Sequence, residues 1–168
     1  NLGLKRLAPG VTMDMCGSVV QENQPYAAEI SPMLSPLGMP CTAPPFGTLS
    51  AIDLKSRKLL WTQPYGSAAG AGPMGLKSHL PITMGLPTFG GSLTTRSGLT
   101  FIAASPDGYL RAIDTKTGKV AWKTKLPVPG ISTPASYFSS ASGRQFIVIS
   151  PAGSKSLGTA TGDYVVAY

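Results

Sequence analysis

One segment of the chain occurs twice, 61 positions apart, and this repeat limits the possible folds more than any other feature. The first copy runs over 47–61 and the second over 108–122. Eight positions match in register, in the order Gly, Leu, Ala, Ile, Asp, Lys, Lys and Trp. A match of this extent indicates that the chain is built from repeated structural units.

Each copy has the pattern of strands joined by tight turns. Leu110 and Ala112 alternate with other residues, as in a strand that buries one face. The run 114–119 contains Asp, Thr and Gly, which are typical of a turn, and Trp122 follows as a large apolar anchor. The sequence therefore predicts a strand, a turn and a second strand in each copy.

A second similarity extends the unit on both sides. Residues 101–106 resemble 146–151, and residues 108–113 resemble 163–168. The full unit is expected to contain, in order, strand 99–104, a turn at 105–108, strand 109–114, a turn, and strand 119–124. Short antiparallel strands at this period predict an all-β chain made of β-propeller blades, with a β-sandwich as the alternative.

The repeats account for only part of a closed propeller. A propeller has roughly four blades or more, whereas the repeats here supply about two to three. We therefore expect residues 47–168 to form the last blades of a larger propeller and residues 1–46 to be a loop-rich segment continuing from missing blades. The remaining N-terminal part of the same propeller is the expected partner that covers the open sheet edges. No apolar run is long enough to span a bilayer, and no signal peptide is evident at the start.

The charge pattern argues against a nucleic-acid partner. The formal net charge is +7, but the Lys and Arg residues are scattered singly rather than clustered with aromatic residues. A basic face toward anionic lipid fits this distribution better.

Few residues carry an evident chemistry. Cys16 and Cys41 can form a disulfide in an oxidising compartment, pair with a missing segment or remain as thiols. His79 is the only histidine, so no Cys/His metal pattern exists, and it is interpreted as a loop residue. Asp53 and Asp114 occupy equivalent repeat positions and are expected to cap turns. Asp107 is either a turn residue or a functional carboxylate.

Three loops are rich in Gly and Pro, at 85–91, 127–134 and 150–159. Glycines allow the backbone to approach a ligand closely, and loops at one end of a β scaffold often carry function. The alternative is that these loops only connect blades.

Together, several of these segments resemble one family. The run 85–91, the strand that starts at 98, the segment from Asp107 to Ala112 and the final stretch 158–168 resemble the quinoprotein dehydrogenases, most closely the membrane-bound branch of glucose, quinate and polyol dehydrogenases. The segment 34–47 looks like a loop of that branch, with Phe46 in place of the usual tryptophan.

The resemblance implies an eight-bladed propeller that holds pyrroloquinoline quinone (PQQ) on its axis with a Ca²⁺ or Mg²⁺ ion. It implies oxidation of a sugar, polyol or cyclic hydroxy acid, in the periplasm at the bacterial inner membrane, with electrons passing to ubiquinone. In the family the catalytic base and most metal ligands lie in earlier blades, so we assign no catalytic and no metal-binding residue to this chain.

By the same resemblance, three places are expected to face the cofactor. They are Phe89 and Gly90, Asp107 with the nearby Arg111, and the run Gly153, Ser154 and Lys155. Ser154 stands where glucose-type members have a histidine, and serine cannot carry a proton near neutral pH. This departure counts against glucose specificity and makes a quinate- or polyol-type enzyme a serious rival, while the substrate among the three stays open.

A noncatalytic propeller that acts as a scaffold for other proteins is the alternative function, and a carbohydrate-binding propeller is a third. Scaffold propellers share the repeat signature but have no reason to keep the cofactor-side loops. The loops therefore favour the enzyme.

Overall fold

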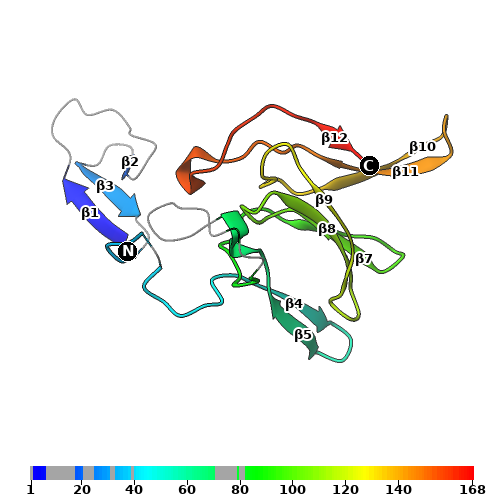
Figure 1. Cartoon of the computed structure of the whole chain (residues 1–168), viewed down its shortest axis with the longest axis horizontal. Coiled ribbons are helices and arrows are strands. Elements are labelled where there is room, and N and C mark those ends of the chain that lie inside the picture. Colours follow the sequence, from blue (N-terminus) through cyan, green and yellow to red (C-terminus); the bar gives the residue numbers. More distant parts are fainter. Residues whose placement is uncertain are drawn as a thin grey trace. The chain divides into compact units, whose positions relative to one another are not determined.

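The computed structural model describes residues 2–6, 18–20, 25–30, 33–38, 40–70, 79 and 82–168. The chain divides into two compact units, Asn1–Thr42 and Ala43–Tyr168. Strands form the regular structure of both units, together with two short 3-10 turns in the described part of the second, η1 (Ala68–Gly70) and η3 (Lys155–Leu157) (Figure 1). No helix within the described ranges has the length and apolar character needed to cross a membrane.

The first unit contains an antiparallel sheet that the sequence pattern did not predict. β1 (Leu2–Arg6) and β2 (Ser18–Val20) both pair with the central strand β3 (Tyr26–Ile30). β3 carries the fully buried Ala27 rather than a row of aliphatic residues, so the alternation by which strands are recognised is weak. The structure thus adds strands to the segment 1–46 that was expected to be loop-rich, while the start of the blades at residue 47 stays a prediction.

The second unit contains a two-stranded, a four-stranded and a three-stranded antiparallel sheet, in the orders β4-β5, β6-β7-β8-β9 and β10-β11-β12. The strands are β4 (Thr48–Asp53), β5 (Lys58–Pro64), β6 (Ser92–Thr94), β7 (Leu99–Ile102), β8 (Tyr109–Asp114), β9 (Val120–Lys125), β10 (Ala135–Ser139), β11 (Arg144–Ile149) and β12 (Val166–Ala167). The strands predicted over 99–104, 109–114 and 119–124 are confirmed as β7, β8 and β9, with ends that differ by at most two residues.

The two copies of the repeat fold alike, including an irregularity in strand pairing. The register between β4 and β5 shifts between Ala51 and Ile52. The register between β8 and β9 shifts at the equivalent place, between Ala112 and Ile113. The sequence repeat is therefore a structural repeat of a β-hairpin with the same bulge.

Asp53 and Asp114 cap the turns of these two hairpins, as predicted. Oδ1 of Asp53 accepts the Lys55 backbone N–H at 2.8 Å, and Oδ1 of Asp114 accepts the Thr117 backbone N–H at 2.8 Å. Hydrogen bonds from Ser56 and Lys55 lower the pKa of Asp53, and those from Thr117 lower the pKa of Asp114. Both carboxylates thus stabilise the turns in their ionised form.

Buried hydrophobic clusters lie on both faces of the four-stranded sheet, over its central strands. On one face lies a cluster of Ala103, Leu110, Leu126, Ile147 and Ile149, which joins the sheet to β11. On the other face lies a cluster of Tyr65, Ile102, Ala104 and Ile113, against which Leu49 and Trp61 of the preceding hairpin pack. This stacking of twisted sheets through both faces is the arrangement of propeller blades.

Trp61 fixes the contact between the first hairpin and the four-stranded sheet. Its indole N–H donates to the backbone oxygen of Thr115 at 3.0 Å, and the Gln63 amide donates to the backbone oxygen of Gly118 at 2.8 Å. A Cβ on Gly118 would lie only 2.9 Å from the Trp61 ring. The side chain of one repeat thus binds the turn of the next.

Candidate functional site

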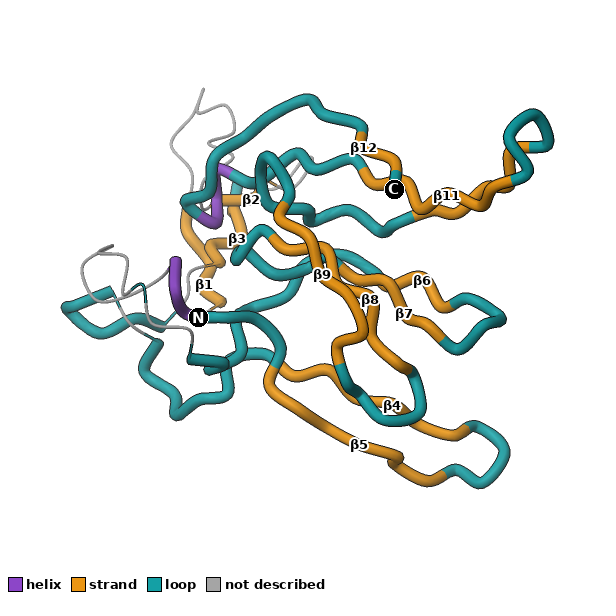
Figure 2. The backbone as a smooth tube through the Cα atoms, turned by 45° about the vertical axis from the view of Figure 1, so that its right-hand side comes forward, coloured by secondary structure: helices purple, strands orange, loops and turns teal. Residues whose placement is uncertain are grey.

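The antiparallel order of the strands gathers the longer loops of the second unit at one end of the sheets. The connections that follow β5, β7, β9 and β11 leave from this end, whereas the short turns after β4, β6, β8 and β10 lie at the other (Figure 2). We call the first the loop end. Its described segments are 65–70, 82–91, 103–108, 126–134 and 150–165.

Hydrogen bonds tie these loops to one another. The backbone N–H of Phe89 donates to the Ala104 oxygen at 2.9 Å, and that of Gly91 donates to the Thr133 hydroxyl at 3.0 Å. The backbone N–H of Gly153 donates to the Pro129 oxygen at 2.9 Å. The loop end is therefore a connected surface to which neighbouring blades contribute.

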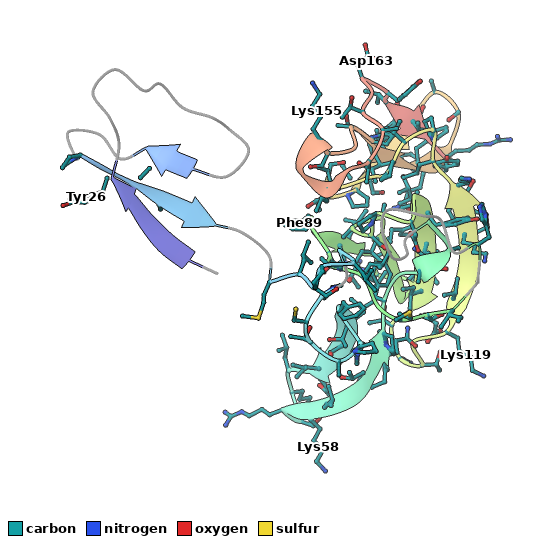
Figure 3. The ribbon with its side chains drawn as sticks, turned by 60° about the vertical axis from the view of Figure 1, so that its left-hand side comes forward. Tyr26, Lys58, Phe89, Lys119, Lys155 and Asp163 are labelled. Atoms are coloured by element: carbon teal, nitrogen blue, oxygen red, sulfur yellow. The ribbon has the colours of Figure 1, made fainter. Side chains whose placement is uncertain are left out.

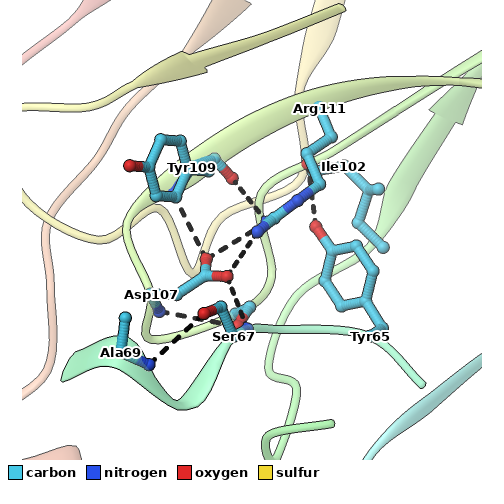
Figure 4. A network of polar contacts seen from close by, with 8 residues as sticks. Tyr65, Ser67, Ala69, Ile102, Asp107, Tyr109 and Arg111 are labelled. Atoms are coloured by element: carbon cyan, nitrogen blue, oxygen red, sulfur yellow. Dashed lines mark hydrogen bonds and ion pairs between the residues drawn. The ribbon is translucent and has the colours of Figure 1, made fainter. Parts of the chain in front are cut away.

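A buried ion pair lies within this surface. Asp107, in the turn between β7 and β8, forms a two-pronged pair with Arg111 of β8, in which Nη1 donates to Oδ1 and Nη2 to Oδ2 (Figure 4). The Asp107 carboxylate also accepts the backbone N–H of Ser67 at 2.9 Å and that of Tyr109 at 3.3 Å. The side chain of Asp107 is 3% exposed and that of Arg111 is 12% exposed. Asp107 thus bonds within its own turn, as the turn interpretation predicted, and also binds the loop that follows β5.

The Arg111 guanidinium is also held by aromatic rings. Its central carbon lies 5.1 Å from the ring centre of Tyr65 and 5.3 Å from that of Tyr109. Burial acts to lower the pKa of Arg111, but the hydrogen bonds and charge of Asp107 outweigh it and raise the pKa. The arginine therefore stays charged in a largely apolar setting.

Tyr65 completes the group. Its hydroxyl donates to the backbone oxygen of Ile102 at 3.1 Å, and the residue is 3% exposed. Burial raises the pKa of Tyr65 to about 12, although the neighbouring Arg111 acts in the opposite direction. The phenol is thus a neutral hydrogen-bond donor at ordinary pH.

The other predicted site residues lie apart from this ion pair but at the same end. Phe89 is 50% exposed as a residue, and Lys155 is exposed in η3 (Figure 3). Ser154 immediately precedes η3, and its backbone N–H donates to the Thr159 hydroxyl at 2.7 Å. The predicted residues therefore share one end of the blades without forming a single cluster.

Gly90 and Gly153 have local structural reasons to be glycine. Gly90 has a φ of 112°, and a Cβ there would lie 2.4 Å from the Ile131 oxygen. Gly153 has a φ of 63°, and a Cβ there would lie 1.8 Å from the Ala160 oxygen. Both glycines allow backbones to cross closely within the loop end, a role that does not require a ligand.

A cavity of about 830 Å³ lies between β5 and β9. Of the predicted site residues, Arg111 alone appears in its lining, together with Tyr65, Ser67, Tyr109 and the basic residues Lys119 and Lys123. Sequence reasoning missed Tyr65 and Ser67. Ser67 acts through its backbone N–H, which no side-chain pattern reveals, and Tyr65 lies outside the matched positions of the repeat.

The groups at the loop end whose chemistry suits a planar, anionic cofactor are the Phe89 ring, the Lys155 ammonium and the Arg111 guanidinium, which do not form one cluster within this chain. The described residues of the loop end offer no comparable set of groups for a metal ion. The Asp107 carboxylate is used by its own neighbours, and within the described residues no three His, Cys, Asp or Glu side chains come together as metal ligands. His79 is exposed, and Cys41 is an exposed thiol, whereas Cys16 lies outside the described residues.

Comparison with known proteins identifies the family. Residues 9–147 match the family model described as PQQ, glucose/ethanol/alcohol dehydrogenase, β-propeller domain. The chain is 50% identical to a probable quinate dehydrogenase (quinone) of Xanthomonas campestris over an alignment of 152 residues, which spans 90% of this chain and 19% of that protein. It is 44% identical over 152 residues to the quinate/shikimate dehydrogenase (quinone) of Acinetobacter baylyi, with the same coverage.

A third relative, the quinoprotein glucose dehydrogenase of Escherichia coli, is 40% identical over 148 residues, or 88% of this chain and 18% of that protein. The chain thus spans about a fifth of the length of the curated relatives it matches. The predicted all-β propeller is confirmed over the β-sandwich, because the matched domain is itself a propeller. From its strands, its repeat and these matches, the chain belongs to the PQQ-dependent glucose/ethanol/alcohol dehydrogenase β-propeller family.

Proposed function

We propose that this chain is part of a PQQ-dependent dehydrogenase that oxidises a hydroxyl of a cyclic hydroxy acid, sugar or polyol. The observation that carries the proposal is the family match over 9–147, together with relatives named as quinate and glucose dehydrogenases. Quinate is the substrate we expect to be oxidised best, because two relatives named for quinate share 50% and 44% identity with the chain, against 40% for the glucose enzyme. Ser154, at the position of a glucose-type histidine, agrees with this order.

The donor set of the loop end fits PQQ, which is flat, aromatic and carries carboxylates. In this proposal the half-exposed Phe89 offers an apolar contact and the exposed Lys155 cation balances carboxylate charge, whereas Arg111, whose charge is paired with Asp107, offers only the guanidinium N–H groups that Asp107 does not take. When bound, PQQ supplies the quinone that is reduced as the substrate hydroxyl is oxidised. The residues of this chain bind and orient, and the proton acceptor and the ligands of Ca²⁺ or Mg²⁺ are expected elsewhere in the protein.

The electron acceptor and location belong to the same proposal. Two relatives carry the word quinone in their names, which supports transfer of electrons to membrane ubiquinone. Action in the periplasm at the inner membrane, with the rest of the propeller as partner, follows from the resemblance to the membrane-bound branch. The noncatalytic scaffold is the competing function.

The test uses the full-length protein purified without PQQ. PQQ is added with Ca²⁺ or Mg²⁺, and dye-linked oxidation is measured with quinate, glucose and glycerol. Activity that requires PQQ and is greatest with quinate is the expected result. Activity with glucose above quinate would overturn the substrate assignment alone. A protein that neither binds PQQ nor oxidises any of the three would instead support the scaffold.

A further inference from the structure

Asp107 was expected to face the cofactor, but its surroundings suggest a different role. Both carboxylate oxygens are already engaged: Oδ1 by Tyr109 N–H and Arg111 Nη1, and Oδ2 by Ser67 N–H and Arg111 Nη2. A carboxylate offers about four acceptor positions, so these contacts use its capacity. A further ligand or a substrate proton would have to displace one of them.

The cavity shows the same division of roles. Arg111 and Ser67 appear in the cavity lining, whereas Asp107 does not. The Asp107 side chain, at 3% exposed, binds those two residues (Figure 4). Any effect of Asp107 on a ligand is therefore transmitted through groups that it holds.

The segment held by Asp107 comes from the preceding repeat. Ser67 lies beyond β5, on the loop that leads to η1, and Asp107 lies 40 positions further along the chain. A Cβ on Gly66 would lie 2.4 Å from the Ser105 hydroxyl oxygen, so this loop sits directly on the turn that carries Asp107. One carboxylate thus connects two neighbouring blades at the loop end.

We propose that Asp107 is a positioning residue, which holds Arg111 and the segment 65–69 in place and contacts neither cofactor nor metal itself. Its effect on PQQ binding rests on the proposed function, but its effect on the protein without PQQ does not. Because the contacts are formed within the protein, they are expected in the absence of any ligand.

The experiment measures hydrogen exchange in the full-length protein without PQQ, for wild type and Asp107→Asn. Asparagine keeps the shape but replaces one acceptor by an N–H₂ group, which opposes the donors of Arg111 or Ser67. We expect exchange of the segment 65–69 to become about 10- to 100-fold faster, the range for loss of hydrogen bonds to a charged group. Arg111→Lys, which keeps the charge but loses the two-pronged geometry, is expected to have a smaller effect in the same segment.

Asp114→Asn is the matched control. Asp114 lies at the other end of β8 and accepts backbone N–H groups of Lys116 and Thr117 in an exposed turn. We expect this variant to accelerate exchange in its own turn and leave the segment 65–69 as in the wild type. PQQ titration of the same proteins then follows, and Asp107→Asn is expected to weaken binding by about 10- to 100-fold, as loss of a residue that orients a ligand does at other sites.

Three results would overturn the proposal. The first is weaker PQQ or metal binding by Asp107→Asn with unchanged exchange over 65–69, which would make Asp107 a direct contact. The second is no change in either measurement. The third is faster exchange throughout the blades, including the turn at Asp114, which would make the pair a general stabiliser. If the wild type itself binds no PQQ, the proposed function fails and the exchange result still decides the role of Asp107.

Discussion

The contact between Trp61 and Gly118 gives the sharpest prediction for how neighbouring blades are held together. We expect Gly118→Ala to loosen this contact. The substitution has two costs. Gly118 has a φ of 73°, where an alanine costs about 1–2 kcal/mol. The added Cβ would also lie 2.9 Å from one atom of the Trp61 ring and 3.1 Å from two others, so the indole has to move.

Movement of the indole disrupts its 3.0 Å hydrogen bond to the Thr115 oxygen, which contributes about 0.5–1.5 kcal/mol. Together with lost ring packing, we expect Gly118→Ala to destabilise the contact by about 2–4 kcal/mol. The matched control is Gly143→Ala. Gly143 has a similar φ of 65°, but no heavy atom lies within 4 Å of its added Cβ, so only the backbone cost of about 1–2 kcal/mol applies.

The measurement is hydrogen exchange of the turn at 114–119 in the full-length protein, compared with that of the turn containing Gly143. Exchange reports local opening, which suits a protein of several blades better than one global unfolding transition. The expected excess of about 1–2 kcal/mol for Gly118→Ala corresponds to about 5- to 30-fold faster exchange beyond the control. Equal effects of the two substitutions would show that the Trp61 contact adds nothing to the blade interface.

Three further substitutions follow from the same structure. Burial raises the pKa of Tyr65 to about 12, above its value of about 10 in an unfolded chain. The stability that Tyr65 contributes is therefore present below pH 10 and is lost as the pH rises toward 12. In the free energy of unfolding measured against pH, Tyr65→Phe should remove about 2–3 kcal/mol of this alkaline loss, and an unchanged pH profile would contradict the assignment. Gly153→Ala should distort the loop at 150–160 and weaken PQQ binding, whereas Gly158→Ala, with a φ of 64° and open space at its Cβ, should bind PQQ as the wild type does. Trp61→Phe keeps an aromatic ring but leaves the Thr115 oxygen without the indole donor, so hydrogen exchange of the turn at 114–119 is expected to show a loss of about 1–2 kcal/mol, and unchanged exchange would mean that water replaces the bond.

The blades could be predicted from the sequence because their pattern is local. Leu110 and Ala112 alternate in the strand, Asp114 and Gly118 mark the turn, and the same residues recur 61 positions earlier apart from the glycine, whose counterpart is Arg57. Arg57 adopts the same left-handed backbone, with a φ of 58°, so the turn keeps its shape without glycine. The repeat thus predicted both the strands and the equivalence of the two hairpins.

The sheet of the first unit could not be found in this way. β1, β2 and β3 are short, and β1 pairs with β3 rather than with β2, the next strand in the sequence, so backbone hydrogen bonds rather than a visible alternation define them. Their sequence carries no copy of the repeat that might have revealed them.

The sequence indicated which loops to consider but not how their residues are bonded. The Gly- and Pro-rich loops that resemble the family do lie at one end of the blades, yet Asp107 is bound by Ser67 through a backbone N–H, which leaves no trace in the side-chain pattern. Arg111, the ion-pair partner of Asp107, lies only four positions further along the chain, but in an isolated strand such spacing gives no reason to expect a buried pair. The burial comes from the neighbouring blade, which the local sequence does not describe.

The contact made by Trp61 also has a direction. The donor side chain belongs to one blade and the accepting turn to the next, so the two surfaces of each blade are complementary rather than identical. Such head-to-tail contacts either close into a ring or continue without limit. Blades separated from their neighbours, for example by proteolysis, would therefore expose two surfaces that fit each other and would be expected to form open chains, whereas a closed propeller leaves neither surface free.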